Sequence, residues 1–126
     1  MLSGQKTILI VEDEISLLHA LRDKLAREGF AVLEAKNGKE GLGIALREHP
    51  DLILLDIIMP VMDGITMLKK LRHDLWGVQA AVMILTNLSD AEDVLMRSDK
   101  DPLDYLVKTD WKLEDVAAKV KEVLGA

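Results

Sequence analysis

Short apolar runs alternate along this chain with longer segments in which apolar residues recur at helical spacing. The runs are Ile8–Val11, Ala31–Ala35, Leu52–Leu55, Ala81–Leu85 and Tyr105–Val107. Four of these five runs are apolar throughout, which is typical of parallel strands covered on both faces. The remaining run, Ala31–Ala35, contains Glu34 and therefore suits the edge of a sheet.

The segments between these runs are amphipathic and carry the signals that begin and end helices. Predicted helical faces are formed by Leu18, Leu21 and Leu25, by Ile65, Leu68 and Leu71, and by Leu113, Val116 and Val120. The predicted N-terminal caps are Asn37 with Glu40, Asp63, and Ser89 with Glu92. Gly29 and Gly125 lie where the first and last helices should end.

This alternation of strands and helices predicts an α/β fold. Strand–helix units repeated five times form a parallel sheet with helices on both faces. Because crossovers are right-handed, we expect a five-stranded parallel sheet of order 2-1-3-4-5, in a flavodoxin-like three-layer sandwich with five helices. In this order the winding reverses between the first and third strands, so a crevice should open at their carboxyl ends.

Composition sets limits on this picture. A chain of 126 residues is about one domain, and we expect a single domain over residues 1–126, with a core at about residues 6–124 and no effector domain. The net charge of −6 argues against a nucleic-acid-binding surface. The chain has no cysteine and no apolar run long enough to cross a membrane. We therefore expect a cytoplasmic protein that does not contact nucleic acid or membrane directly.

Polar residues follow the predicted strands at the points where the strands end. Glu12 and Asp13 follow the first strand, Asp56 the third, Thr86 the fourth and Lys108 the fifth. Since the carboxyl ends of parallel strands share one edge of the sheet, these side chains should meet in one crevice. Each signal alone is weak, because acids at a strand–helix junction are common and lysines are usually solvated. The joint pattern is what indicates a site.

The chemistry of this set indicates phosphoryl transfer to an aspartate. Carboxylates about 4 Å apart repel by about 1–4 kcal/mol per pair. A hard cation with oxygen ligands, Mg²⁺ above all, should relieve that repulsion. Asp56 would then act as the nucleophile, while the metal and Lys108 neutralise the transferred group and Thr86 donates a hydrogen bond.

With these residues in place, the chain resembles a response-regulator receiver domain (CheY-like), the aspartate-phosphorylated module of two-component phosphorelay signalling. The motif ILIVEDE resembles the family's acidic pair, LILLDIIMPVMDG its phospho-acceptor strand and turn, MILT its hydroxyl strand and DYLVK its lysine strand. The resemblance implies that Asp56 is the phosphorylation site. It also implies a Mg²⁺ site formed by Asp13, Asp56 and the backbone carbonyl of Ile58, with Glu12 acting through metal-bound water.

The same resemblance implies a catalytic role for Lys108 and Thr86, and a switch formed by Thr86 and Tyr105. The implied phosphodonor is a sensor histidine kinase or a histidine phosphotransfer protein. The implied output surface comprises the predicted helix after Ser89, the strand Tyr105–Val107 and the last helix, where a partner or a second copy would bind as a homodimer. Such a domain catalyses its own phosphorylation and dephosphorylation but is not a metabolic enzyme.

The chain departs from the family pattern at two positions, each directly after a predicted site residue. Thr109 follows Lys108, where the family usually has a proline in a cis peptide, and Asn87 follows Thr86, where it usually has a small residue.

Two alternative functions are also open. One alternative is a receiver-fold interaction module that is never phosphorylated, although the complete acidic set with Lys108 argues against it. The other is a flavodoxin-like nucleotide or flavin binder, which should have a Gly/Ser/Thr-rich phosphate loop where this chain has VEDEIS.

Overall fold

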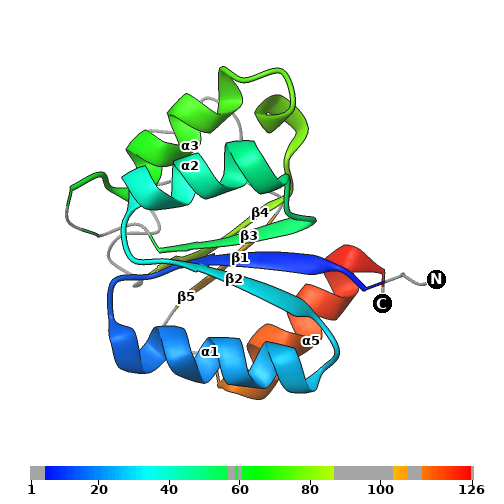
Figure 1. Cartoon of the computed structure of the whole chain (residues 1–126). Helices are drawn as coiled ribbons and strands as arrows, with labels where there is room; N and C mark the ends of the chain where they lie inside the picture. Colours follow the sequence, from blue (N-terminus) through cyan, green and yellow to red (C-terminus); the bar gives the residue numbers. More distant parts are fainter. Residues whose placement is uncertain (1–4, 57–58, 60, 87–103, 108–111, 126) are drawn as a thin grey trace.

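A parallel β-sheet forms the centre of the molecule (Figure 1). The computed structural model describes residues 5–56, 59, 61–86, 104–107 and 112–125, and only the backbone of residues 86 and 104–107. The strands are β1 (Thr7–Val11), β2 (Ala31–Ala35), β3 (Leu52–Asp56), β4 (Val82–Thr86) and β5 (Asp104–Val107). They pair in the order β2-β1-β3-β4-β5, and every neighbouring pair is parallel. The predicted α/β fold with a parallel sheet is confirmed.

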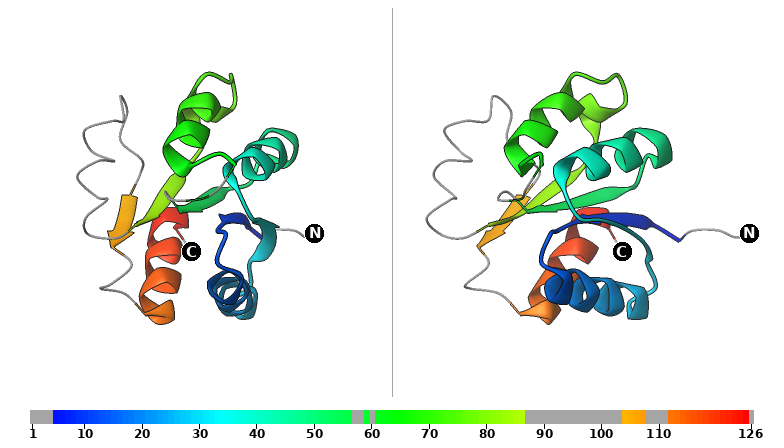
Figure 2. Two further views of the ribbon diagram at one scale, coloured as in Figure 1. Left: turned by 90° about the vertical axis from the view of Figure 1, so that its left-hand side faces the viewer. Right: turned by 60° about the vertical axis from the view of Figure 1, so that its left-hand side comes forward.

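Helices cover both faces of the sheet. The described helices are α1 (Ile15–Arg27), α2 (Gly38–Glu48), α3 (Gly64–Arg72), α5 (Leu113–Leu124) and a short 3₁₀ turn, η1 (Gly77–Gln79). Figures 1 and 2 show α1 and α5 on one face, with α2 and α3 on the other. The helix predicted to begin near Ser89 lies outside the described residues.

The side chains of the central strands divide between two hydrophobic clusters, one for each face. In β1, Leu9 and Val11 pack in the cluster under α2 and α3, whereas Ile8 and Ile10 pack in the cluster under α1 and α5. All of these side chains are buried. Burial of one such side chain contributes about 1.5–3 kcal/mol to folding. The continuous apolar runs in the sequence reflect this burial on both faces.

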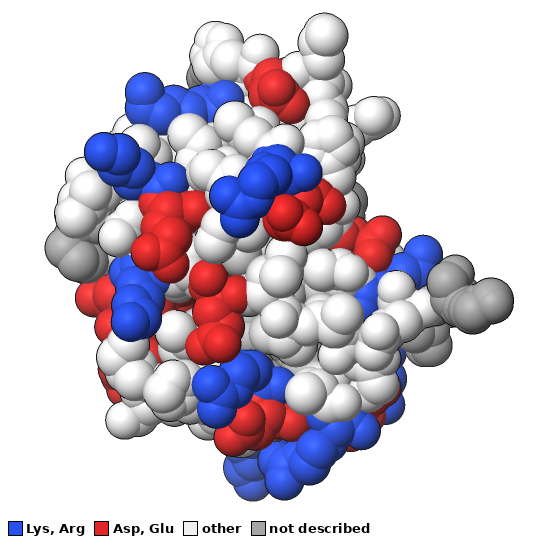
Figure 3. All heavy atoms as spheres, in the orientation of Figure 1, with Lys and Arg blue, Asp and Glu red and all other residues white. Residues whose placement is uncertain are grey.

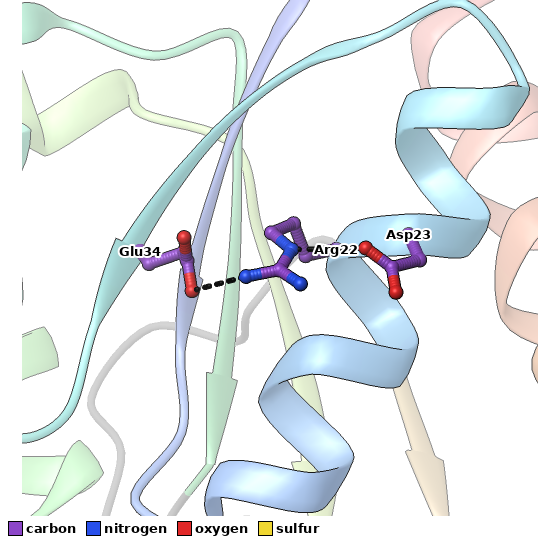
Figure 4. Close-up of polar contacts among 3 residues, drawn as sticks. All are labelled: Arg22, Asp23 and Glu34. Atoms are coloured by element: carbon purple, nitrogen blue, oxygen red, sulfur yellow. Dashed lines mark hydrogen bonds and ion pairs between the residues drawn. The ribbon is translucent and has the colours of Figure 1, made fainter.

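The edge strand β2 is less buried and carries a charged side chain, as its sequence predicted. The first four of its residues are half-buried. Arg22 of α1 lies between Glu34 of β2 and Asp23 of its own helix, at 3.6 Å and 3.0 Å (Figure 4). Asp23 raises the pKa of the Arg22 guanidinium above its ordinary value. A charged side chain on an edge strand also discourages pairing with another chain.

Helix caps in the described part of the chain follow the sequence signals. Asn37 Oδ1 accepts a hydrogen bond from Glu40 N, and Asp63 Oδ1 accepts one from Thr66 N, each at 2.8 Å. Gly125 ends α5 with φ +70°, a conformation that glycine adopts without steric cost. These predicted caps are confirmed, whereas the Ser89–Glu92 capping box lies outside the described residues.

The turn between α3 and β4, at the amino edge of the sheet, was not predicted. Arg72 Nη1 donates hydrogen bonds to Gly77 O at 2.7 Å and to Ala80 O at 2.8 Å. Trp76 stacks on the ring of His49, with centroids 4.3 Å apart and planes 5° from parallel. His49 itself ends α2 in the left-handed region, at φ +49°. The stacking of Trp76 on His49 joins residues far apart in the chain, which a local pattern does not reveal.

Charge on the face seen in Figure 1 is mixed. Figure 3 shows acidic and basic side chains interspersed on this face, without a large patch of either sign. None of the helices in the described ranges is both long and apolar enough to pass through a bilayer.

Candidate functional site

Two neighbouring strands bring three acidic side chains together at the carboxyl edge of the sheet. Glu12 and Asp13 directly follow β1, and Asp56 is the last residue of β3. Val11 is paired with Leu55, so the chain positions that follow these two residues are also adjacent. One carboxylate oxygen from each of the three acids lies within 4.8 Å of the others. The convergence predicted from the strand order is confirmed for these residues.

Burial increases the electrostatic repulsion within this cluster compared with a group of acids on the surface. Glu12 is 1% exposed and Asp56 is 5% exposed, whereas Asp13 is exposed to solvent. Carboxylates at such separations repel by about 1–4 kcal/mol per pair, and more strongly where the surroundings exclude water. The cluster consists of oxygen donors only, which are the ligands that Mg²⁺ and Ca²⁺ prefer. The donor set therefore fits a hard divalent cation, with Asp13 on the solvent side.

Backbone hydrogen bonds hold the acidic segment after β1 in place. Glu12 N donates to Ala35 O of β2 at 3.0 Å. The Glu12 carboxylate turns back and accepts a hydrogen bond from Glu14 N at 3.1 Å. Glu14 is the N-cap of α1 but makes no side-chain cap of its own. Glu12 thus satisfies an amide near the start of α1 while keeping its carboxylate beside Asp56, which fixes its orientation.

The segment after Asp56 is held at several described positions. Met59 is buried, Met62 O accepts a hydrogen bond from Gly38 N at 2.9 Å, and Asp63 caps α3. Between them, Val61 has φ +69° and its side chain is 77% exposed. A β-branched residue with positive φ is an outlier that the surrounding structure must impose. Neither this feature nor the Gly38 contact was predicted from the sequence, although a glycine directly after an N-cap asparagine was a signal for the latter.

The other predicted site residues are only partly described. Thr86 ends β4, and the preceding residue, Leu85, pairs with Asp56 of β3. The backbone of Thr86 therefore reaches the same edge of the sheet as the acids. Tyr105 lies in β5, where it pairs with Ile84. The side chains of Thr86 and Tyr105 lie outside the described residues.

Two predicted residues, Ile58 and Lys108, lie wholly outside the described part of the chain, as does the peptide bond between Lys108 and Thr109. Their predicted roles as metal ligand and phosphoryl partner therefore stay predictions. The structure supports the acidic half of the site.

Known proteins with similar sequences and structures share this fold. The chain is 35% identical over 119 residues to the alkaline phosphatase synthesis transcriptional regulatory protein PhoP of Bacillus subtilis, covering 94% of this chain and 48% of PhoP. The chain spans about half the length of the curated relatives it matches. Among solved structures, it is similar to a response regulator from Chloroflexus aurantiacus, with 26% identity, a TM-score of 0.86 and coverage of 98% of this chain and 100% of that chain.

A second solved structure concerns the acidic edge directly. It is the receiver domain of a sensor histidine kinase from Pseudomonas aeruginosa, with a magnesium ion coordinated in its active site cleft. Its identity to this chain is 25% and its TM-score is 0.86, covering 98% of this chain and all of that one. The family model described as the response regulator receiver domain matches residues 8–121 of this chain. With this match added to the parallel sheet and the acids at its carboxyl edge, the chain belongs to the receiver-domain family of two-component signalling proteins.

Proposed function

We propose that this receiver domain accepts a phosphoryl group on Asp56 from a histidine kinase or a histidine phosphotransfer protein. The observation that carries the proposal is the meeting of Glu12, Asp13 and Asp56 at one edge of the sheet, with one carboxylate oxygen of each within 4.8 Å of the others. Membership of the family supports the same chemistry. Among these acids, Asp56 is the one that ends a central strand, β3.

The metal in this proposal is Mg²⁺, held by Asp13, Asp56 and the backbone carbonyl of Ile58, with Glu12 acting through bound water. Bound there, it supplies positive charge that offsets the negative charge of the transferring phosphoryl group. Its affinity should be weak, about −4 kcal/mol, which is a dissociation constant in the millimolar range.

The protein groups carry out the transfer itself. A carboxylate oxygen of Asp56 attacks the phosphorus of the donor phosphohistidine, so one O–P bond forms while the P–N bond breaks and the imidazole leaves. Lys108 pairs with the phosphoryl group, and Thr86 donates a hydrogen bond to it. The product is an aspartyl phosphate beside Glu12 and Asp13.

In this proposal, phosphorylation shifts the equilibrium between two arrangements of packed side chains. In the proposal, Thr86 moves toward the phosphoryl group and Tyr105 rotates into the space that it leaves. This change alters the surface formed by the helix predicted after Ser89, β5 and α5, where a partner or a second copy binds. Phosphorylation can shift this equilibrium only through contacts that differ between the two states. We also propose that the protein is located in the cytoplasm.

Intact-mass measurement tests the phospho-acceptor. The protein is incubated with acetyl phosphate or phosphoramidate in the presence of Mg²⁺, and we expect the mass to increase by one phosphoryl group. Asp56→Asn should show no increase. The matched control is Asp51→Asn, at the other end of the same strand, where Asp51 Oδ2 accepts a hydrogen bond from Thr7 N at 2.7 Å.

Three results would contradict the proposal. The first is an undiminished mass increase in Asp56→Asn, and the second is an increase that survives removal of Mg²⁺ with EDTA. The third is the absence of any increase in the wild-type protein, which would favour a phosphorylation-independent interaction module. Sedimentation with and without beryllofluoride then tests the output, with stronger association expected in its presence.

A further inference from the structure

The first residue of α2 lies against the segment that follows Asp56. Gly38 is buried, and its N–H donates a hydrogen bond to Met62 O at 2.9 Å. A Cβ atom added to Gly38 would lie 2.3 Å from Met62 O and 2.9 Å from Met62 C. Real Cβ atoms essentially never come closer than 3.0 Å to such atoms. The blocking atoms belong to the backbone, so rotation of a side chain cannot relieve the clash.

The contacted segment is short and connects the candidate phospho-acceptor to α3. Met62 lies six positions after Asp56 and two before the start of α3 at Gly64. Val61, next to the contact, has φ +69° with its side chain exposed to solvent. Valine does not favour this conformation by itself. The contact with Gly38 is one of the interactions that impose the path of this segment.

The turn that leads into α2 also contacts the other acidic segment. Ala35 O, at the end of β2, accepts the hydrogen bond from Glu12 N at 3.0 Å. Ala35 and Gly38 are three positions apart, so one short turn is bonded to both acid-bearing segments. Asn37, between them, caps α2 by accepting a hydrogen bond from Glu40 N. Figure 1 shows the start of α2 beside the segment that leads into α3.

We propose that Gly38 is a positioning residue for the acidic site. Its missing side chain lets α2 approach Met62, so that one turn, from Ala35 to Gly38, holds both Glu12 and the residues before α3 in the arrangement that metal binding needs. This inference rests on the proposed function, because it concerns the same Mg²⁺ site. In this proposal Gly38 acts through its hydrogen bond to Met62 O.

Another glycine of α2 provides a matched control. A Cβ atom added to Gly43 would meet nothing within 4 Å. Gly43→Ala therefore makes the same chemical change in the same helix without touching another segment. It should raise the melting temperature slightly, because alanine favours a helix interior over glycine.

Mg²⁺ affinity distinguishes a positioning role from a purely structural one. Titration with Mg²⁺ alone, followed by amide chemical shifts of Glu12 and Asp13 well below the melting temperature, should show about tenfold weaker binding in Gly38→Ala. Gly43→Ala should bind Mg²⁺ as the wild type does. Equal affinities in the two variants, both folded, would overturn the inference and leave the proposed function intact. If the wild-type protein itself binds no Mg²⁺, both proposals fail.

A second measurement needs no substitution, in case Gly38→Ala does not fold. Hydrogen exchange of the Gly38 amide in the wild-type protein reports how often its bond to Met62 O opens. If opening this bond disrupts the site, exchange should slow by up to about tenfold at a Mg²⁺ concentration about ten times the dissociation constant. The Gly43 amide serves as the internal reference. Exchange at Gly38 that does not respond to bound Mg²⁺ would overturn the inference.

Discussion

The amino and carboxyl edges of the sheet differ in which charged groups lie close together. At the amino edge, charged groups meet partners within the chain. Arg72 Nη1 donates to two carbonyl oxygens, and Glu28 lies between Lys24, at 3.5 Å, and Lys121. At the carboxyl edge, charged groups of like sign also lie close together, because one carboxylate oxygen each from Glu12, Asp13 and Asp56 lies within 4.8 Å of the others.

This difference indicates which charged groups stabilise the fold and which would lower its stability until a cation binds. Paired groups at the amino edge join elements that are distant in sequence, such as α1 and α5. The three carboxylates at the carboxyl edge repel one another, and a bound cation would offset that repulsion. Substitutions at the two edges should therefore separate into two classes. Those at the amino edge should lower stability without changing Mg²⁺ affinity, and those at the carboxyl edge should lower Mg²⁺ affinity without lowering the stability of the metal-free protein.

Removal of Asp13 should give the largest effect. Asp13→Ala takes away the exposed acid of the cluster, and we expect Mg²⁺ affinity to fall by about 100-fold or more, in line with losing a direct ligand. Mg²⁺ at about ten times its dissociation constant should stabilise the wild type by about 1.4 kcal/mol. The variant should lose nearly all of this response. Melting curves recorded against Mg²⁺ concentration measure both quantities.

The same variant without metal provides the control. Since one source of repulsion is gone, the metal-free variant should be as stable as the metal-free wild type or more stable, by up to about 1 kcal/mol. Tight Mg²⁺ binding that persists in Asp13→Ala would contradict the assignment of the site. A metal-free variant that is clearly less stable would show that Asp13 is a structural residue, and the contrast between the edges would fail there.

Structural features that depend on local chemistry or on the order of the strands could be predicted from the sequence, and the acidic cluster is of the second kind. The runs around β1 and β3 are apolar throughout because both faces are buried, and the caps at Asn37 and Asp63 depend on residues within one turn. The cluster followed from one topological rule, because parallel strands end at the same edge. Glu12 and Asp56 needed no more than that rule to be placed together.

Features that depend on contacts between distant segments could not be predicted. Val61 has a positive φ although valine disfavours it, because its neighbours in the fold determine the path of the chain. The Gly38 amide meets Met62 O across 24 positions of sequence, and the ring of His49 meets Trp76 in another loop. Propensity carries no information about such pairs. The assignments of Lys108 and Tyr105 stay predictions, because their side chains lie outside the described residues.

Arg72 tests the amino edge, with an intermediate effect on stability. Its guanidinium is half-buried, and burial lowers its pKa from the ordinary value. Arg72→Met would leave Gly77 O and Ala80 O without their charged donor while keeping most of the apolar stem. Hydrogen bonds from a charged group contribute about 1.5–3 kcal/mol, so the free energy of unfolding in urea should fall by about 2 kcal/mol. Mg²⁺ affinity should not change.

Arg72→Lys is the matched variant for charge. It keeps the positive charge, but its ammonium lacks the rigid planar geometry that places Arg72 Nη1 between the two acceptors, so we expect part of the loss to remain. A weakened Mg²⁺ affinity in Arg72→Met, measured well below its melting temperature, would contradict the separation of the two edges. It would mean that the turn after α3 communicates with the acidic site across the sheet.

Glu28 should give the smallest effect, and pH reveals its origin. The side chain of Lys121 hydrogen-bonds to Glu28 and lowers the pKa of its carboxyl group below the ordinary value of 4.5, with a further contribution from Lys24. A carboxyl group whose pKa is lower in the folded protein stabilises the fold above its unfolded pKa, and this contribution is lost as pH falls through the folded pKa. Glu28→Gln should therefore be less stable than the wild type near neutral pH, and the two proteins should converge in acid. Urea unfolding across that range measures the difference, which should also shrink in about 1 M salt because the ion pair is accessible to solvent. Glu48→Gln removes a carboxylate that pairs only with its neighbour Arg47 in the described part of the chain, and it controls for the loss of one negative charge. A difference for Glu28→Gln that persists unchanged in acid would show that Glu28 acts through packing between α1 and α5. The amino edge would then be stabilised there by packing instead of by charge pairs.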